Sequence, residues 1–412
     1  MGHARISPPA LDPPRGSAFE GSLEPGGDWT MTALPFRLSV IVPVHQGAVV
    51  LPKSLGALVE SDLPRDDWEL IVVDDASTDG TAAVAARYAD TVVTLGRKPQ
   101  GPSYARNRGV EAARGDVVVF IDADVCVHRE TLRRFASVFA ENPGFSAVFG
   151  SYDAAPPAPG LVSQYRNLLH HWVHQQNGGE AETFWAGCGA IRRDVFLKAG
   201  MYDEWHFSRP QIEDIELGHR LKELGYRITL APEIQATHLK HWTLRNMLTT
   251  DLRDRGVPWT RLLIQRGMVS KSQSLNLRLI ERVNTVLVWT AALFAIVALG
   301  FRDARWLLLG VACGLPVLWF NRHLYAFFRR ERGFWFAVRA IPLHLIYYFL
   351  NGIAVGWGWF VHHAVGEPQP AVAVEAFSEV GLQSWPPVPR KAPDRLADNE
   401  GHVSSQRRTD VT

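Results

Sequence analysis

Cysteine and net charge are both scarce in this chain of 412 residues. The cysteines Cys126, Cys188 and Cys313 lie far apart with no C-x-x-C or Cys/His spacing, so the sequence predicts neither a disulfide framework nor a structural zinc site. The 43 Lys and Arg residues nearly balance the 42 Asp and Glu residues, so no strong global field indicates a nucleic-acid partner. The N-terminus also lacks the basic start and apolar core of a signal peptide.

Apolar residues are abundant but unevenly distributed. At 47% hydrophobic and 21% charged residues, the composition is typical of a folded globular protein. Residues 1–36 are rich in proline and glycine without apolar periodicity, which predicts a disordered leader. Residues 364–412 are polar and rich in proline, which predicts a disordered tail.

Short β-rich runs alternate with helical stretches in residues 37–250. The runs lie at 39–44, 70–73, 91–95 and 117–121, and the helical stretches at 49–60, 81–89, 103–113, 130–140 and 212–224. Nearly continuous apolar strands that alternate with helices are typical of a mostly parallel sheet buried on both faces. The sequence therefore predicts a nucleotide-binding α/β domain.

Three long uncharged runs follow, at 283–301, 306–321 and 340–361. Because about 20 residues span a bilayer, the first and third are candidate spans and the second is short, which predicts a membrane region over 283–363 with two to three spans. Five arginines against one glutamate place loop 322–339 in the cytoplasm. If 340–361 then spans once, the tail lies outside.

Seven basic residues also stand among apolar ones in segment 251–282. This pattern predicts an interfacial segment on anionic lipid, and a solvated helix face is the alternative.

Two carboxylates directly follow the buried run 117–121. Asp122 and Asp124 are two residues apart, so in an extended chain they face the same way. At the carboxyl edge of a parallel sheet they can hold a hard divalent cation that bridges phosphates. The alternative is an ordinary strand end with solvated aspartates.

Five further motifs stand in order around this D-x-D. They are the first strand with Pro43-Val44, the stretch Asp74–Gly80, the segment Ala105–Gly109 and the W-A-G-C-G run from Trp185, with Glu213-Asp214 after them. In this order the chain resembles family 2 glycosyltransferases, a GT-A-fold group that uses nucleotide-activated sugars. The resemblance covers residues 39 to about 245.

The resemblance implies a donor site on the first half of the domain. Pro43, Val44, Asp74 and Asp75 would line the base and ribose pocket, and Arg106 would lie near the nucleotide. Carboxylates suit such a pocket because they accept hydrogen bonds from base and ribose groups. The polar turn after Asp74 is also compatible with simple helix capping.

The resemblance also implies a Mg²⁺ or Mn²⁺ site. Asp122 and Asp124 would contact the ribose and the metal-bound diphosphate, and the cation stabilises charge on the leaving group. His238 is a further candidate ligand, with an ordinary partly buried histidine as the alternative.

Asp214 would act as general base on the acceptor hydroxyl in a single, inverting displacement. Trp185, Gly187, Cys188 and Glu213 would form the acceptor side. The alternative for the acidic pair is a favourable contact with a helix macrodipole. The histidines at 170, 171 and 174 are interpreted as a further acceptor-side surface.

Together these features predict a metal-dependent, inverting hexosyltransferase of the inner membrane, with its catalytic domain in the cytoplasm. Its partners would be a nucleotide-sugar donor and a lipid-linked or envelope glycan acceptor, not nucleic acid. A Q-x-x-R-W segment is absent, although Arg255–Trp259 lies in a similar place with different spacing. The alternatives are a processive polysaccharide synthase component and a catalytically inactive nucleotide-binding scaffold.

Overall fold

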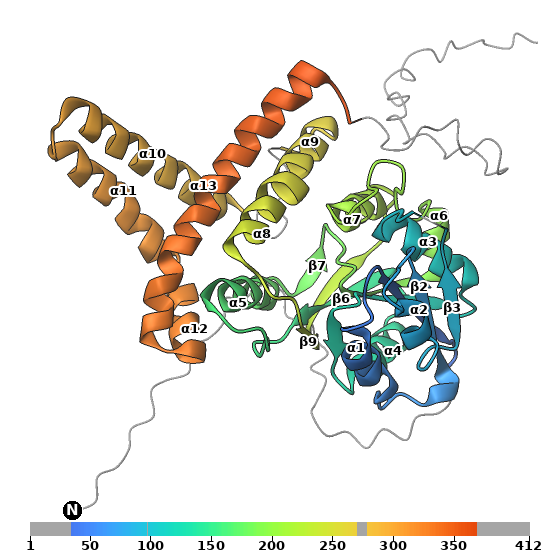
Figure 1. Cartoon of the computed structure of the whole chain (residues 1–412). Helices are drawn as coiled ribbons and strands as arrows, with labels where there is room; N and C mark the ends of the chain where they lie inside the picture. The colour runs from blue at the N-terminus through green and yellow to red at the C-terminus, as the bar shows by residue number, and fades with distance from the viewer. Residues whose placement is uncertain (1–33, 97, 270–277, 369–412) are drawn as a thin grey trace, which may run out of the picture. The chain divides into compact units, whose positions relative to one another are not determined.

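A computed structural model describes residues 34–96, 98–269 and 278–368 (Figure 1). Four parallel strands form the first half of the sheet in the order β3-β2-β1-β4. Their bounds are β1 Leu38–Val44, β2 Trp68–Asp74, β3 Thr91–Thr94 and β4 Val117–Ile121. The four predicted strands are confirmed, since no end differs by more than two residues from its predicted position.

The second half of the sheet is mixed. It contains β5 Val125–Val127, β6 Ala147–Tyr152, β7 Gly179–Ala181, β8 Cys188–Arg192 and β9 Ile228–His238. Strand β8 runs antiparallel to both β4 and β6, whereas β6 and β9 are parallel. The expected mostly parallel arrangement therefore holds for the first half of the sheet. Strands β5 and β7 have three residues each and are too short to produce a recognisable apolar run.

Helices cover both faces of the sheet. One face packs against α1 Leu51–Val59, α2 Thr81–Ala85 and α4 Thr131–Glu141, and the other against α3 Pro102–Ala112, α6 Arg193–Lys198 and α7 Glu213–Glu223. Helix α2 is shorter than the predicted 81–89. Backbone bonds from Arg87 to Val84 and from Tyr88 to Ala85 tighten its end, and this turn leads the chain into β3.

A continuous helical run leaves the catalytic domain. It consists of α8 Leu244–Thr249, the π-helical turn η2 Thr250–Gly256 and α9 Val257–Gln265. Thr243 starts it with a capping box, because its hydroxyl accepts from the Asn246 N–H while Asn246 Oδ1 accepts from the Thr243 N–H. The predicted boundary between residues 250 and 251 therefore falls inside a helix.

Four helices make up the apolar region, namely α10 Leu279–Phe301, α11 Arg305–Phe320, α12 Arg322–Arg332 and α13 Phe334–Val365. By length and composition α10 and α13 can each cross a membrane, and α11 with α12 forms a pair bent by 64° that would count as a third span if the pair were one broken span. Figure 1 shows α10 and α11 side by side as a hairpin.

Segment 322–339 is not the loop that its charge suggests. Leu324, Phe327 and Phe328 recur at helical spacing on α12, and their buried face packs against α5 (Leu161–Gln175) of the catalytic domain. Arg332 adds bonds to Gln164 Oε1 and to the carbonyl of Ala154. The helix ends at Gly333, whose φ of 88° favours glycine.

Helix α13 contacts other elements along much of its length. Near its start, Ala340 and Leu343 belong to the apolar cluster around α5. Further along it packs on η2 and α9, so closely that a Cβ added at Gly358 would lie 2.7 Å from Thr260 Cβ. At its end, Arg261 donates to the carbonyl of Gly366 across 2.8 Å. Most of the predicted leader and most of the predicted tail lie outside the described residues, although Leu34 and Phe36 at the end of the leader pack against the core of the α/β domain.

Candidate active site

Strand pairing brings the predicted donor-side motifs to one edge of the sheet. Val44 at the end of β1 stands beside Asp74 at the end of β2, and Ile121 of β4 pairs with Cys188 of β8. The last pairing continues into a bond from the Asp122 N–H to the carbonyl of Gly187. The D-x-D and W-A-G-C-G motifs are therefore neighbours, although 60 residues separate them.

The two acidic residues after β2 are buried and already have partners. Asp74 Oδ1 accepts from the Ser77 N–H at 3.1 Å, as in a capping turn. Asp75 accepts from the backbone N–H groups of Gln100 at 2.8 Å and Gly101 at 2.7 Å. Both carboxylates therefore organise loops around the expected nucleotide pocket, and Asp75 fixes the loop that leads into α3.

Arg106 joins the donor side to the acidic pair on α7. Its guanidinium donates to Asp122 Oδ1 at 2.8 Å and to Glu213 Oε1 at 3.0 Å, and its side chain is only 5% exposed. Burial alone would lower the pKa of Arg106, but the Asp122 and Glu213 carboxylates raise it above its ordinary value. A permanently charged residue thus holds two sequence-distant acids in one network.

Asp124 lies next to His238 because β5 pairs with the end of β9. Val125 is the register partner of His238, and the Leu239 N–H donates to the carbonyl of Asp124. His238 Nε2 lies 3.5 Å from Asp124 Oδ2, while Nδ1 contacts Asn167 Oδ1 at 2.7 Å. With Nδ1 donating to the amide oxygen, the Nε2 lone pair of neutral His238 faces a carboxylate, an arrangement that a proton or a cation would stabilise.

Metal binding is compatible with this pair but needs further ligands. Among the described residues, no group of three or more His, Cys, Asp or Glu side chains is arranged to hold a metal ion. Asp122 instead pairs with Arg106. Asp124 and His238 provide oxygen and nitrogen donors, and a phosphate-bridging cation commonly takes its remaining ligands from substrate phosphates and water. The site therefore fits a cation that arrives with a diphosphate.

Asp214 stands in the first turn of α7, directly after the buried Glu213. Burial raises the pKa of Asp214 and the Glu213 carboxylate raises it further, to about 7, against the opposing charges of Arg255 and Arg106. A carboxylate with a pKa near neutrality can both take up and release a proton at working pH. Asp214 therefore has the properties of a general base.

Aromatic and histidine rings form the wall beyond the D-x-D. The Trp185 ring lies 4.7 Å from Tyr152 and 5.0 Å from His170, and Tyr152 stacks on His238 at 4.2 Å. Gly187 is required here because a Cβ would lie 2.5 Å from the Trp185 ring. Trp185 thus contributes its side chain to this wall.

Two residues predicted for the acceptor side offer it no exposed side chain. Cys188 is fully buried in the core, and Glu213 is buried against Arg106. Cys188 therefore contributes to the core packing beneath the site, and Glu213 helps to position Arg106.

Three residues of the site had no clear signal in the sequence. Asn167 lies on α5, 71 residues before the histidine that it contacts. Lys240 acts electrostatically on both Asp122 and Asp124, and burial lowers its pKa. Arg255 acts on Asp214 but lies in a segment whose pattern predicts lipid contact or a solvated helix face. Only folding brings them to the site.

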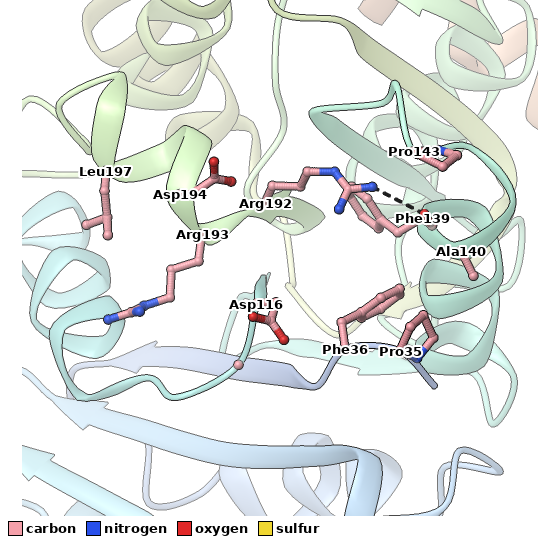
Figure 2. A pocket seen from close by; sticks show the side chains of 11 residues that line it. Pro35, Phe36, Asp116, Phe139, Ala140, Pro143, Arg192, Arg193, Asp194 and Leu197 are labelled. Atoms are coloured by element: carbon pink, nitrogen blue, oxygen red, sulfur yellow. Dashed lines mark hydrogen bonds between the residues drawn. The ribbon is translucent and has the colours of Figure 1, made fainter. Parts of the chain in front are cut away.

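A cavity of about 550 Å³ lies at the opposite edge of the sheet (Figure 2). Phe36, Asp116 and Arg193 are among its lining residues, which precede β1 and β4 or begin α6. Arg192 is already bonded to the backbone carbonyls of Phe139 and Phe145. Because this cavity lies at the amino ends of β1 and β4, it is separate from the carboxylates described above.

A carboxylate-lined edge of the sheet beside a candidate general base is compatible with a nucleotide-dependent transferase. Residues 39–200 match the family described as glycosyl transferase family 2. Residues 39–200 therefore belong to glycosyl transferase family 2, which together with the curated relatives supports a glycosyltransferase activity. The GT-A fold expected from the motifs is confirmed.

Curated relatives are also glycosyltransferases. Glycosyltransferase AglE of Haloferax volcanii is 25% identical over 275 residues, which cover 65% of this chain and 82% of the relative. The probable glycosyltransferase YdaM of Bacillus subtilis is 30% identical over 217 residues, with 49% of this chain and 50% of the relative covered. Among solved structures, the mannosyltransferase PcManGT of Pyrobaculum calidifontis, in complex with GDP-Man and Mn²⁺, has 19% identity and a TM-score of 0.47 over 78% of this chain and 87% of its own.

Proposed function

We propose that this chain is an inverting, metal-dependent hexosyltransferase that acts on a membrane-associated acceptor, a lipid-linked or envelope glycan precursor. The network that carries the proposal is Asp122–Arg106–Glu213, which holds the D-x-D edge next to Asp214. One charged residue thus couples the two groups that such a reaction needs, a diphosphate-binding edge and a base.

The donor would bind at the carboxyl edge of β1, β2 and β4. Asp74 and Asp75 would accept hydrogen bonds from base and ribose beside Pro43 and Val44. Asp75 already accepts from Gln100 and Gly101, so nucleotide binding would rearrange or share these bonds.

Asp124 and His238 would hold a Mg²⁺ or Mn²⁺ ion, with Asp122 near the ribose. Bound there, the cation would supply positive charge to the diphosphate leaving group. His238 is oriented for this role by Asn167, and the Asp122 carboxylate is kept in place by Arg106.

Asp214 would take the proton of an acceptor hydroxyl as the hydroxyl oxygen forms a bond to the anomeric carbon. The bond from that carbon to the diphosphate oxygen breaks on the opposite face, and its electron pair leaves with the nucleoside diphosphate. A single displacement of this kind inverts the anomeric configuration. The pKa of about 7 supports Asp214 as the base at neutral pH.

The membrane part is proposed to belong to an inner membrane, with the catalytic domain in the cytoplasm where nucleotide sugars occur. The hairpin of α10 and α11 would cross the bilayer, since residues such as Leu299, Leu308 and Leu315 present exposed apolar side chains. Contact of α12 with α5 supports a cytoplasmic position for the arginine-rich segment. Contacts of the start of α13 with α5 and of its end with Arg261 of α9 support a position of both ends of α13 near the cytoplasmic side.

A screen of radiolabelled nucleotide sugars against the purified full chain in lipid nanodiscs tests the function. Each donor is offered with a lipid extract as acceptor source, with Mg²⁺, Mn²⁺ or EDTA. We expect one donor to release its nucleoside diphosphate and label a lipid-soluble product, with loss of both signals in EDTA. Binding of nucleotide without transfer from any donor would instead favour the inactive scaffold, and a growing polymer would favour the processive synthase component.

A further inference from the structure

Ion pairs connect the π-helical turn η2 to two elements of the candidate active site, α5 and the segment that leads into α7. On one side, Asp251 forms an ion pair of 2.5 Å with Arg166 of α5, and both side chains are largely buried. On the other side, Asp254 lies 3.4 Å from Arg209, in the segment that leads into α7. The turn is therefore fixed relative to His170 on α5 and to Asp214 on α7. π-Helical turns of this kind often occur at functional sites.

Arg255 is a cation on this turn that has no partner in the described part of the chain. Its guanidinium has no hydrogen-bond or ion-pair partner among the residues that the structure describes. Residues four apart lie on the same side of a helix, so Arg255 shares the side of Asp251, which faces α5. Its charge opposes the rise in the pKa of Asp214 and adds to the effect of burial in lowering the pKa of Lys240, which agrees with a position between α5 and α7.

The next residue brings the same turn against the apolar helix α13. A Cβ added at Gly256 would lie 2.5 Å from Ala354 Cβ, so the two helices approach closely at this point. Arg255 therefore lies where an apolar helix meets the acidic site. A guanidinium is well suited to bind phosphate there, because its planar fork can donate two parallel hydrogen bonds to phosphate oxygens.

The presence of a candidate general base, Asp214, indicates that a ligand held by Arg255 also carries a hydroxyl group. A phosphate oxygen is already ionised at neutral pH and needs no base to attack, whereas a sugar hydroxyl must lose a proton. A site with both a base and a free guanidinium fits an acceptor that has a hydroxyl at one end and a phosphate at the other. The donor diphosphate is expected at Asp124 and His238 instead.

We propose that Arg255 binds the phosphate of a lipid-linked sugar acceptor and so positions the sugar hydroxyl at Asp214. The inference rests on the proposed glycosyl transfer and specifies the acceptor as a lipid phosphate or diphosphate that already carries a sugar. Arg255 is in this sense a specificity-determining residue.

Ligand binding tests this without requiring transfer. The full chain is placed in phosphatidylcholine nanodiscs and titrated with farnesyl diphosphate and with farnesol, its neutral counterpart. Charge-assisted hydrogen bonds predict about tenfold or greater preference for the diphosphate in the wild type. Arg255→Gln should abolish the preference, and Arg255→Lys should retain part of it as a point charge. Arg253→Gln is the matched control, because Arg253 is exposed on the same turn, and it should retain the full preference.

Four results would overturn the proposal. The first is an unchanged preference in Arg255→Gln, and the second is an equal loss of preference in Arg253→Gln. The third is weaker UDP or GDP binding in Arg255→Gln, which would assign the cation to the donor. The fourth is equal competition by phosphatidylglycerol, which would make Arg255 a general lipid contact. If the donor screen fails while the preference stands, glycosyl transfer is wrong and the phosphate site remains.

Discussion

Asp214 is the residue whose protonation state should set the pH profile. Its pKa of about 7 lies far above the ordinary value because of burial and Glu213, and only the deprotonated form can act as a base. We therefore expect kcat to rise with pH through about 7 and to decline below it. Asp214→Asn should lower kcat by roughly 10²-fold or more and leave donor affinity unchanged. Steady-state kinetics with nucleotide-binding measurements separate the two effects, and an equal loss of donor affinity would assign Asp214 to donor binding.

Asp124 is the residue through which metal dependence should be most visible. Asp124→Asn replaces a carboxylate with a neutral amide, a weaker ligand for a hard cation, so transfer should nearly disappear. Asp116→Asn is the matched control, because Asp116 lies at the opposite edge of the sheet by the cavity of Figure 2. Circular dichroism should report an intact fold in both variants. Full activity of Asp124→Asn in the presence of EDTA would contradict a metal role.

Helix α7 carries the candidate base Asp214, and ion pairs connect it to the end of α9, which packs against α13. Arg266, which directly follows α9, donates to Glu216 at 2.7 Å and lies 2.7 Å from Glu223, with its own side chain 9% exposed. Removing a largely buried charged donor leaves its acceptor under-satisfied, so Arg266→Gln should destabilise the domain by about 2 kcal/mol. Arg253→Gln removes an exposed arginine whose partner Asp254 keeps its contact with Arg209, so it should change stability by less than about 0.5 kcal/mol.

Thermal unfolding of both variants in the same nanodiscs compares these costs. If the ion pairs of Arg266 with α7 hold α9 in place, backbone amide hydrogen exchange in α9 should also be faster in Arg266→Gln. Equal melting temperatures for the two variants would mean that Arg266 contributes no more than a surface pair.

Elements with a strong periodic signal were predictable from the sequence, and elements defined by distant partners were not. The strands up to Ile121 are apolar and regular, so their order and ends could be predicted. Strands β5 and β7 have three residues each and form only because β9 is there to pair with them. The arginines of segment 322–339 dominate its composition and predict a loop, whereas Leu324 and Phe327 mark the buried face of helix α12.

The site was predictable to a similar degree. Local motifs in the sequence predict three residues of the site, Asp122, Asp124 and Asp214. The bridge made by Arg106 and the contact of Asn167 with His238 depend on pairings across 107 and 71 residues. Such pairings leave no local pattern, so only the folded chain can reveal them.

At the scale of the whole molecule, the contacts of α13 predict the topology. If α10 and α11 cross as a hairpin, their turn lies outside, while α12 and the end of α13 stay with the catalytic domain. Single cysteines are introduced as Ala304→Cys, Glu331→Cys and Pro368→Cys in a chain without its native cysteines. We expect an impermeant thiol reagent on intact cells to label position 304 and to leave 331 and 368 unlabelled.

Each alternative arrangement gives a different pattern. Labelling at 368 would mean that α13 crosses the membrane, which places the tail outside. Labelling at 331 would separate α12 from the cytoplasmic side and contradict its contact with α5. An unlabelled position 304 would indicate a re-entrant hairpin.

The Arg106 bridge also constrains how the chain can change during evolution. Loss of Arg106 would leave Asp122 and Glu213 without their shared cation, and loss of Glu213 would leave a buried guanidinium with one partner fewer. Substitutions at these three positions are therefore expected to be tolerated together more readily than singly. In a related protein that has lost catalysis, substitutions are expected to accumulate at all three positions. The presence of all three residues together in another sequence is therefore expected to distinguish active enzymes from inactive relatives.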